Sequence, residues 1–433
     1  MRIFKTSGFG WIGPFIFLSA IVSGHLLAQE DEPVSTTQAE EPAVTTPDKG
    51  TAEEEVPSVG VGKFFKLPFH VSISVRGGYD DNVLSQSDEF RQGSAYLESL
   101  LGITYVFGNS RTQVNLHSEF SFTKYFEDIP DAGNNFNPNL NLAASHKVSP
   151  RLTLSLAVYL TYQQEPDFTN NFIGVTRRSG NYFFTNDKLS ATYLWTPRFS
   201  TVSSFTLVGI NYADTAVGEF QNRTENTFGN EFRFLLWPTT SIIAEYRFEF
   251  ISYQTPTPQS RDSITNYFLG GFDHSFSPRV NLSARGGVSV RKTDGIDQVR
   301  LDPYGSASLN YTVGPHLTLA WTASYSLQEP DTVGSPARTS LQTGLTGIYK
   351  ITPRITSNLS VFYEHDENDG QMSFFFFIPP FAENILSLSA SVRYALNRNW
   401  GMELGYSFTG LTSGQSFRDY DKSRFYGGAN FQF

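Results

Sequence analysis

Charged side chains spaced two apart gather on both sides of Pro238, and they are the clearest candidates for a binding site in this sequence. In an extended strand, residues two apart face the same side, so each run presents acids and arginines on one surface. Pairing of opposite charges on neighbouring strands favours Arg233 with Glu245. It also favours Glu231 with Arg247. Such a set either stiffens a sheet through salt bridges or forms a ladder that binds solutes. The charged residues are Glu231, Arg233, Glu245, Arg247 and Glu249.

A second polar group raises the question of nucleophilic catalysis. His117, Glu119 and Ser121 alternate along the chain and therefore share one face of a predicted strand. A nucleophile and its base must lie within hydrogen-bond reach, whereas alternate residues of a strand lie about 7 Å apart. We therefore expect a polar row and no catalytic group, and we expect that the protein is not an enzyme.

Two runs of acidic residues raise the question of a Ca²⁺ site. Oxygen ligands suit Ca²⁺, but neither run has the ligand spacing of a defined calcium loop. We expect solvated acidic loop tips, and the sequence predicts no metal and no cofactor. The chain has no Cys, which excludes thiolate metal sites. The first run holds Asp80, Asp81, Asp88 and Glu89, and the second holds Glu364, Asp366, Glu367 and Asp369.

The elements that carry these residues have a period of two. In 152–162 the even positions are apolar or aromatic, while Thr and Ser occupy most of the odd positions. The segments 280–290 and 386–396 repeat this pattern. Alternation indicates strands with one apolar face, and runs of ten or more residues exceed typical globular strands. They match the roughly 9–11 residues that a tilted strand needs to cross a bilayer.

Short turns and long polar loops alternate along the chain from about residue 69. Four short turns read Ser/Thr-Pro-Arg, around Pro150, Pro197, Pro278 and Pro353. Proline pre-sets the backbone for the second position of a type I turn. Eight short turns and nine long loops join 18 strands, which predicts an all-β fold, an antiparallel up-and-down transmembrane β-barrel. The short turns are then periplasmic. A periplasmic β-sandwich or solenoid is the alternative, although neither requires this alternation.

The composition fits strands that are half exposed to lipid. Only 17% of the residues are charged, against roughly 25% in typical soluble domains, while 15% are aromatic. Eight of the nine strands that lead into long loops end in Tyr, and Trp and Phe cluster beside the short turns. Aromatic residues at both ends of the strands suit the headgroup levels of a bilayer, so this placement predicts two aromatic belts.

The region before the barrel divides into two parts. Residues 1–28 have a basic start, an apolar core and a small residue at Ala28, which predicts a secretory signal peptide. Residues 29–66 follow as a predicted disordered periplasmic segment. Its first part, Gln29 to Gly60, holds nine acidic residues and one Lys, a net charge of -8 out of -10 for the chain. The predicted barrel then covers 67–433. Docking of the acidic segment to a basic partner is an alternative to a purely solvated tail.

The predicted inward faces carry both signs of charge. An 18-strand barrel leaves an aqueous lumen unless loops or a plug fill it. Small inward residues such as Ser155, Ser283 and Ser389 leave room for water. Mixed charges predict weak ion selectivity. The expected lumen charge ladder consists of Glu231, Arg233, Glu245, Arg247, Glu249, Arg285 and Arg393.

The last predicted strand ends on an aromatic residue. Phe425, Phe431 and Phe433 share its apolar face. This resembles the C-terminal signature of outer-membrane proteins, in which a terminal aromatic residue is recognised by the barrel-assembly machinery. Together with the signal peptide, it predicts the outer membrane of a Gram-negative bacterium, where the barrel contacts lipid and lipopolysaccharide. A homo-oligomer is left open, and no nucleic-acid partner is expected.

Short motifs carry a family resemblance. The first strand ends in Gly77-Gly78-Tyr79-Asp80-Asp81-Asn82-Val83, and the Ser/Thr-Pro-Arg turns recur, one after Trp195. These features resemble the putative beta-barrel porin 2 family over about 69–433. The resemblance implies an outer-membrane barrel, with some relatives linked to exopolysaccharide export. It transfers no catalytic residues.

Two classes of function follow from these patterns. The first is a porin-like channel for passive diffusion of small hydrophilic solutes. The second is an outer-membrane component of a polysaccharide or polymer export system, or a structural barrel with a closed lumen. Exposed Phe runs are costly in water, so we expect the eighth long loop to fold into the mouth and narrow it. Its candidate constriction residues are Phe374, Phe375, Phe376, Phe377 and Phe381.

Overall fold

The strands alternate between a lipid-suited and a polar face, and they close into a single barrel. The structure is a computed structural model, and it describes residues 69–130, 133–163, 181–254, 261–294, 299–330, 335, 337–372 and 377–433. The predicted signal peptide and acidic segment lie outside these residues. Eighteen antiparallel strands form one sheet, and β1 pairs with β20 to close it. The predicted all-β barrel of 18 strands is confirmed.

The strands are long and of similar length. The first nine are β1 (Phe69–Asp80), β2 (Ser94–Gly108), β3 (Thr112–Tyr125), β4 (Asn135–Ser149), β5 (Leu152–Gln163), β6 (Tyr182–Thr196), β7 (Phe199–Tyr212), β8 (Arg223–Trp237) and β9 (Thr240–Tyr253). The other nine are β10 (Ser263–Ser277), β11 (Val280–Thr293), β12 (Val299–Val313), β13 (Leu317–Gln328), β14 (Arg338–Thr352), β15 (Ile355–Asn368), β18 (Phe381–Ala395), β19 (Trp400–Ser413) and β20 (Tyr420–Gln432).

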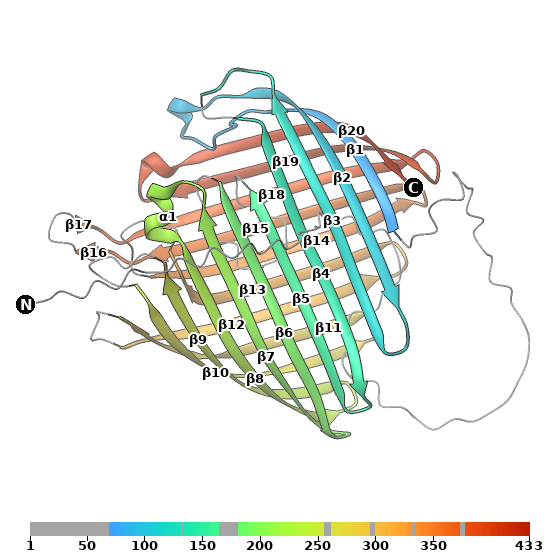
Figure 1. Ribbon diagram of the computed structural model, residues 1–433, viewed down its shortest axis with the longest axis vertical. Helices are drawn as coiled ribbons and strands as arrows, with labels where there is room; N and C mark the ends of the chain where they lie inside the picture. The colour runs from blue at the N-terminus through green and yellow to red at the C-terminus, as the bar shows by residue number, and fades with distance from the viewer. Residues whose placement is uncertain are drawn as a thin grey trace, which may run out of the picture.

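Small elements lie between the strands at the end with the long loops. They are η1 (Asp88–Phe90), α1 (Thr215–Gln221), η2 (Ser416–Arg418) and the two-stranded ribbon of β16 (Gln371–Met372) and β17 (Phe377–Ile378). None of the helices in the described part of the chain is long and apolar enough to span a bilayer. We call this end of the barrel the long-loop end and the opposite end the short-turn end. The C-terminus lies at the short-turn end, as Figure 1 shows.

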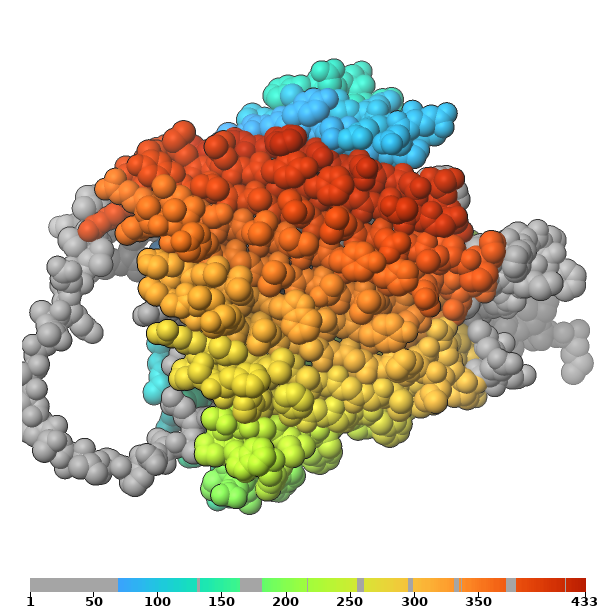
Figure 2. Space-filling model, turned by 180° about the vertical axis from the view of Figure 1, so that it is seen from behind, coloured from blue at the N-terminus to red at the C-terminus, as the bar shows by residue number. Residues whose placement is uncertain are grey.

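Alternation along each strand separates the outer surface from the interior. In β19, Leu404 is 70% exposed while its neighbour Glu403 is 6% exposed. The same contrast holds in β14, where Leu341 faces out and Ser340 is buried. Figure 2 shows the strands from yellow to red side by side in a continuous outer wall. The outer face therefore presents apolar side chains, which is the surface that lipid requires.

The Ser/Thr-Pro-Arg sequence builds the short turns through its first residue. In the β4–β5 turn, Ser149 Oγ accepts hydrogen bonds from the backbone N–H groups of Arg151 and Leu152 at 3.2 and 3.1 Å. In the β6–β7 turn, Thr196 Oγ1 accepts from Arg198 and Phe199 at 3.3 and 3.0 Å. The hydroxyl thus satisfies backbone donors that the ladder leaves unpaired at its end.

Glycine pairs permit close strand contact at two seams. A Cβ on Gly78 of β1 would lie 2.1 Å from the carbonyl oxygen of Phe425 in β20. A Cβ on Gly271 of β10 would lie 2.1 Å from the carbonyl oxygen of Ala284 in β11. Only glycine fits such an approach. In Figure 1, β1 and β20 run along one edge of the barrel, and β10 lies along the other.

Candidate functional site

The barrel interior is the candidate site, and its exposure changes along the barrel axis. Along the inward face of β14, Lys350 at the short-turn end is exposed and Thr346 is half-buried. Gln342, Ser340 and Arg338 follow toward the long-loop end and are all buried. The inward face of β3 behaves in the same way. The interior is therefore more open at the short-turn end and more tightly packed at the long-loop end.

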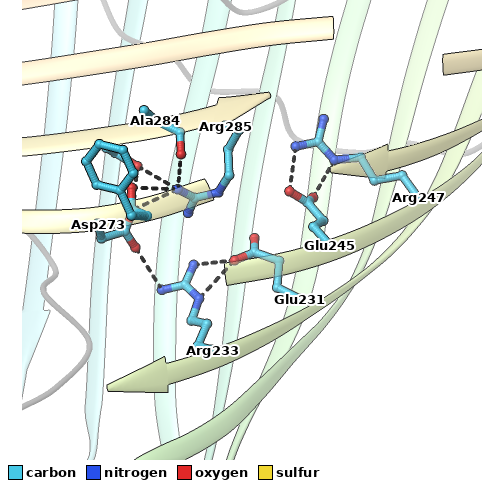
Figure 3. A network of polar contacts seen from close by, with 9 residues as sticks. Glu231, Arg233, Glu245, Arg247, Asp273, Ala284 and Arg285 are labelled. Atoms are coloured by element: carbon cyan, nitrogen blue, oxygen red, sulfur yellow. Dashed lines mark hydrogen bonds and ion pairs between the residues drawn. The ribbon is translucent and has the colours of Figure 1, made fainter. Parts of the chain in front are cut away.

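The predicted charge ladder lies on the inward faces of β8 and β9, and its pairing runs along each strand. Arg233 Nη2 lies 2.7 Å from Glu231 Oε2. Arg247 Nη2 donates to Glu245 Oε2 at 3.1 Å. Figure 3 shows the two arginines beside the acids of their own strands. These four predicted residues are brought together, as the sequence pattern indicated.

The expected cross-strand pairing within this ladder is wrong. The register sets Glu231 opposite Glu245 and Arg233 opposite Ile243. The two carboxylates would repel each other across this register. Each is instead neutralised by the arginine two residues further along its own strand. The long arginine side chain spans the spacing between alternate residues. A two-residue difference in register was enough to exchange the partners, and the sequence around Pro238 does not define that register.

Residues from β10, β11 and β12 extend the ladder. Arg285 Nη1 donates to Asp273 Oδ1 at 2.9 Å, and Ser283 Oγ donates to the same oxygen at 2.5 Å. Arg233 Nη1 lies 3.8 Å from Asp273 Oδ2, so Asp273 joins the two arginines, as Figure 3 shows. Arg247 Nη1 donates to the Tyr304 hydroxyl at 3.2 Å.

Sequence reasoning did not identify Asp273 and Tyr304 as part of this ladder. The alternation of β10 places Asp273 on the inward face with Tyr267 and Leu269. Gly270 and Gly271 interrupt the alternation of apolar and polar side chains in the sequence, so the pattern does not show which residues of this strand face inward. Placing Phe272 on the lipid face would have located Asp273 inside.

The two remaining predicted ladder residues lie apart from this group. Glu249 Oε2 accepts a hydrogen bond from the Tyr267 hydroxyl at 2.9 Å, further toward the long-loop end. Arg393 lies in β18, where the register sets it opposite Glu403 of β19. Each residue faces the interior as expected, but they belong to separate groups on the wall.

Buried ion pairs occupy the long-loop end of the interior. Arg291 pairs with Glu329, which also accepts a hydrogen bond from the Tyr253 hydroxyl. Arg261 Nη2 donates to the same hydroxyl at 2.9 Å. Burial alone raises the pKa of Glu329, which follows the end of β13, but the charges of Arg291 and Arg223 outweigh burial and hold that pKa below its usual value. Glu329 is therefore held as a carboxylate.

A second buried group corrects the prediction for the acidic run after residue 363. Arg338 Nη1 lies 2.7 Å from Asp366 Oδ2 and 3.3 Å from Glu364 Oε1, and all three side chains are 0% exposed. These two acids belong to the inward face of β15 and are not solvated loop tips. Glu367 faces outward, and Asp369 pairs with Arg300. The strand extends further than the polar sequence indicated.

The acidic run after Tyr79 is also only partly a solvated loop tip. Asp80 is fully buried, and its Oδ2 lies 3.3 Å from Lys422 Nζ. Asp81 pairs with Arg91, whereas Asp88 and Glu89 are exposed. In the described residues, no group of three or more His, Asp or Glu side chains is arranged to hold a metal ion.

The His117 row is held by neighbours on adjacent strands. Thr104 Oγ1 of β2 lies 2.5 Å from His117 Nδ1. Ser121 Oγ donates to the backbone carbonyl of Asn137 in β4 at 3.4 Å. The serine hydroxyl is thus directed at the barrel backbone and not along its own strand toward the histidine.

Apolar side chains also pack inside the long-loop end. Tyr182, Phe184, Ile210 and Tyr212 form one buried cluster on β6 and β7, and Val217 of α1 packs against it. A second cluster on β15, β18 and β19 holds Phe362, Ile385 and Leu411. The register places the members of both clusters in line with inward polar residues. Sequence reasoning missed both, because an apolar residue on a polar face interrupts the pattern it relied on.

The predicted constriction residues fall mostly outside the described residues. Phe374, Phe375 and Phe376 lie in the part that the structure does not describe, Phe377 begins β17, and Phe381 begins β18. Phe425, Phe431 and Phe433 of the predicted assembly signal lie on the outer face at the end of the chain, and the Phe431 and Phe433 rings have centroids 5.7 Å apart.

A closed barrel with an apolar outer face and a charged, hydroxyl-rich interior defines the class of porin-like membrane barrels. The chain belongs to the putative beta-barrel porin 2 family, whose sequence profile matches residues 59–433. This is a family of porin-like outer-membrane barrels. The predicted family and the predicted class of protein, a porin-like outer-membrane barrel, are therefore confirmed. The comparison with curated proteins finds no match.

The similarities to solved structures have low sequence identity and low TM-scores. The outer membrane protein OpdK from Pseudomonas aeruginosa is 13% identical, with 84% of this chain and 99% of that chain covered and a TM-score of 0.41. OccAB4 from Acinetobacter baumannii is 10% identical, with 85% and 99% covered and a TM-score of 0.41. The siderophore receptor PirA from Pseudomonas aeruginosa is 11% identical, with 84% and 80% covered and a TM-score of 0.38.

Proposed function

We propose that this protein forms a water-filled channel in the outer membrane, through which small hydrophilic solutes diffuse passively. The observation that carries the proposal is the inward face of an 18-strand barrel, which is lined with Ser, Thr, Asn and paired charges. Side chains alone do not fill a barrel of this size. The short-turn end would face the periplasm, as in other outer-membrane barrels.

The charge ladder supports weak selectivity in such a channel. The six residues that gather around its ion pairs on β8 to β11 are three acids and three arginines: Glu231, Glu245, Asp273, Arg233, Arg247 and Arg285. The balance of charge leaves neither cations nor anions strongly favoured. Neutral hydrophilic solutes are the best match for this interior. Nothing in this mechanism requires a catalytic group, so we also propose that the protein is not an enzyme.

Conductance of the purified full chain in a planar lipid bilayer tests the proposal. We expect stepwise single-channel openings and swelling of liposomes in uncharged sugars. Ser204 of β7 and Ser389 of β18 lie nine strands apart in the sheet order, on opposite walls, and both face inward. The double variant Ser204→Trp/Ser389→Trp places two indoles in the lumen and should lower the conductance.

A matched control is available on the outer face of each wall. Ala191 of β6 and Ala390 of β18 face outward, so Ala191→Trp/Ala390→Trp adds the same bulk to the lipid side. We expect this variant to conduct like the wild type. Equal conductance of the inward and outward variants would contradict a path through the lumen.

One observation favours the second candidate function. The long-loop end of the interior holds fully buried ion pairs, including Arg338 with Asp366. Such packing fits a barrel with a closed lumen or a component of an export assembly that opens only with its partners. A wild-type protein that inserts correctly but neither conducts nor admits sugars would replace the channel proposal with this candidate.

A further inference from the structure

The short-turn end of the barrel carries a ring of unpaired cations. Eight Lys and Arg side chains lie in or beside the short turns, all are exposed, and none forms an ion pair with any other residue that the structure describes. We call this set the basic ring. Its members are Arg111, Lys147, Arg151, Arg198, Arg279, Lys350, Arg354 and Arg398.

Acidic residues are absent from the same turns. None of the eight linkers 109–111, 150–151, 197–198, 238–239, 278–279, 314–316, 353–354 and 396–399 contains Asp or Glu. Elsewhere in the described barrel, most arginines of the interior and of the long-loop end are paired with carboxylates, as Arg291 and Arg338 are. The basic ring is therefore the part of the barrel at which cations gather without local compensation.

The same chain supplies the complementary charge next to this ring. Gln29 to Gly60 carries a net charge of -8, and the barrel begins at Phe69. Phe69 pairs with Tyr105, four residues before the β2–β3 turn that holds Arg111, so β1 starts at the short-turn end. The acidic segment is thus joined to the end of the barrel that bears the basic ring.

We infer that the acidic segment 29–60 docks on the basic ring at the short-turn end of the barrel. With 18 strands at the usual spacing and tilt, the barrel is about 35 Å wide. The 17 residues from Ala52 to Phe69 reach up to about 55 Å when extended, so the acidic residues can meet every turn of the ring.

Covalent attachment makes the contact effective although each ion pair is exposed and weak. Single exposed pairs contribute little, but many charges of opposite sign act together. A short tether keeps the segment at about millimolar effective concentration beside the ring. The contact should weaken steeply with salt, because the Debye length falls from about 20 Å at low salt to a few ångström at high salt.

Engineered disulfides test this docking directly, because the chain has no Cys of its own. Ala52→Cys keeps every acidic residue of the segment. The second change is Thr239→Cys in the β8–β9 turn. Thr239 is exposed, is not one of the eight cations, and lies about half the barrel circumference from β1. The full chain with both changes is placed in phosphatidylcholine vesicles and oxidised, and cross-linking is read on a non-reducing gel.

The matched control carries the same two cysteines with all nine acids of 29–60 changed to Gln or Asn. We expect cross-linking to be faster with the acidic segment, on the order of tenfold at about 20 mM salt, and the difference to vanish at about 500 mM salt. Replacing the eight ring cations by Gln should slow the acidic segment to the rate of the control. The neutral-segment control leaves the barrel itself unchanged, so its folding is not in question.

Equal rates for the acidic and neutral segments at low salt would overturn the inference. If the rates are equal and phosphatidylglycerol in the vesicles also protects the ring from a Lys- or Arg-modifying reagent, the ring would be assigned to anionic lipid headgroups instead. The measurement needs no ion flow. Failure of the channel proposal and failure of this inference are therefore separate outcomes.

Discussion

At the scale of single residues, the charges of β8 and β9 pair along their own strands. Arg233 reaches Glu231, and Arg247 reaches Glu245, each two positions away on the same face. Alternate side chains lie about 7 Å apart at the backbone, a distance that a guanidinium group spans easily. Each of these two strands thus carries its own neutral pair across a register that sets Glu231 opposite Glu245.

Removal of the ladder acids should change ion selectivity. The double variant Glu231→Gln/Glu245→Gln leaves Asp273 as the single acid of this group beside Arg233, Arg247 and Arg285. We expect the reversal potential in a salt gradient to move toward anion preference. Arg233→Gln/Arg247→Gln should move it toward cation preference. Movement of both variants in the same direction would show that the ladder does not face the conducting path.

Glu329 provides a pH-dependent test at the residue scale. Its pKa in the folded protein lies below the usual value because Arg291 and Arg223 outweigh the effect of burial. A carboxyl with a lowered folded pKa contributes stability above its unfolded pKa of about 4.3, and that contribution is lost as the pH falls through the folded pKa. We expect the urea concentration at the unfolding midpoint, measured in detergent, to decrease when the pH is lowered below about 4.

Glu329→Gln separates this group from the other carboxylates of the barrel. The variant leaves Arg291 without its charged partner, which should lower the unfolding free energy at neutral pH by roughly 3–5 kcal/mol. It should also flatten the decline below about pH 4 relative to wild type. A variant whose midpoint falls with acid as steeply as that of the wild type would assign the decline to other carboxylates.

Adjacent glycines make a matched test at the scale of the strand. In β10, a Cβ on Gly271 would meet the Ala284 carbonyl oxygen at 2.1 Å, whereas a Cβ on Gly270 meets nothing within 4 Å. Gly271→Ala forces the two backbones apart and should cost about 1–3 kcal/mol. Gly270→Ala should cost little. Unfolding midpoints in urea compare the two.

The second strand of this seam repeats the contrast. A Cβ on Gly287 of β11 would lie 2.0 Å from the Phe268 carbonyl oxygen, and one on Gly286 has its nearest neighbour at 3.9 Å. We expect Gly287→Ala to destabilise the barrel and Gly286→Ala to leave it nearly unchanged. A uniform response of all four variants would mean that strand propensity, and not the close approach, decides the outcome.

At the scale of the whole molecule, the orientation of the barrel can be measured on intact cells. Asp419 follows η2 at the long-loop end, and Pro278 lies in the β10–β11 turn at the short-turn end. With the short-turn end in the periplasm, an epitope tag at Asp419 should be labelled from outside and a tag at Pro278 should not. Labelling at Pro278 alone would invert the orientation and place the basic ring outside.

The sequence by itself determined the architecture of this protein. Alternation of apolar and polar residues indicates which face of each strand contacts lipid. The Ser/Thr-Pro-Arg turns indicate where the chain reverses direction. Both signals are local, since each depends on residues within a few positions of one another. The strand number, the order of turns and loops and the family resemblance followed from them and were confirmed.

Only the tertiary structure decided which side chains meet across strands. The partners of Glu231 and Arg233 depend on register, and those of Glu364 and Asp366 on Arg338, which is more than 20 residues away in the sequence. The same acids are solvated in an isolated loop and buried in a closed barrel. Cross-strand register and barrel closure are cooperative properties of the whole sheet, so no local sequence pattern specifies them.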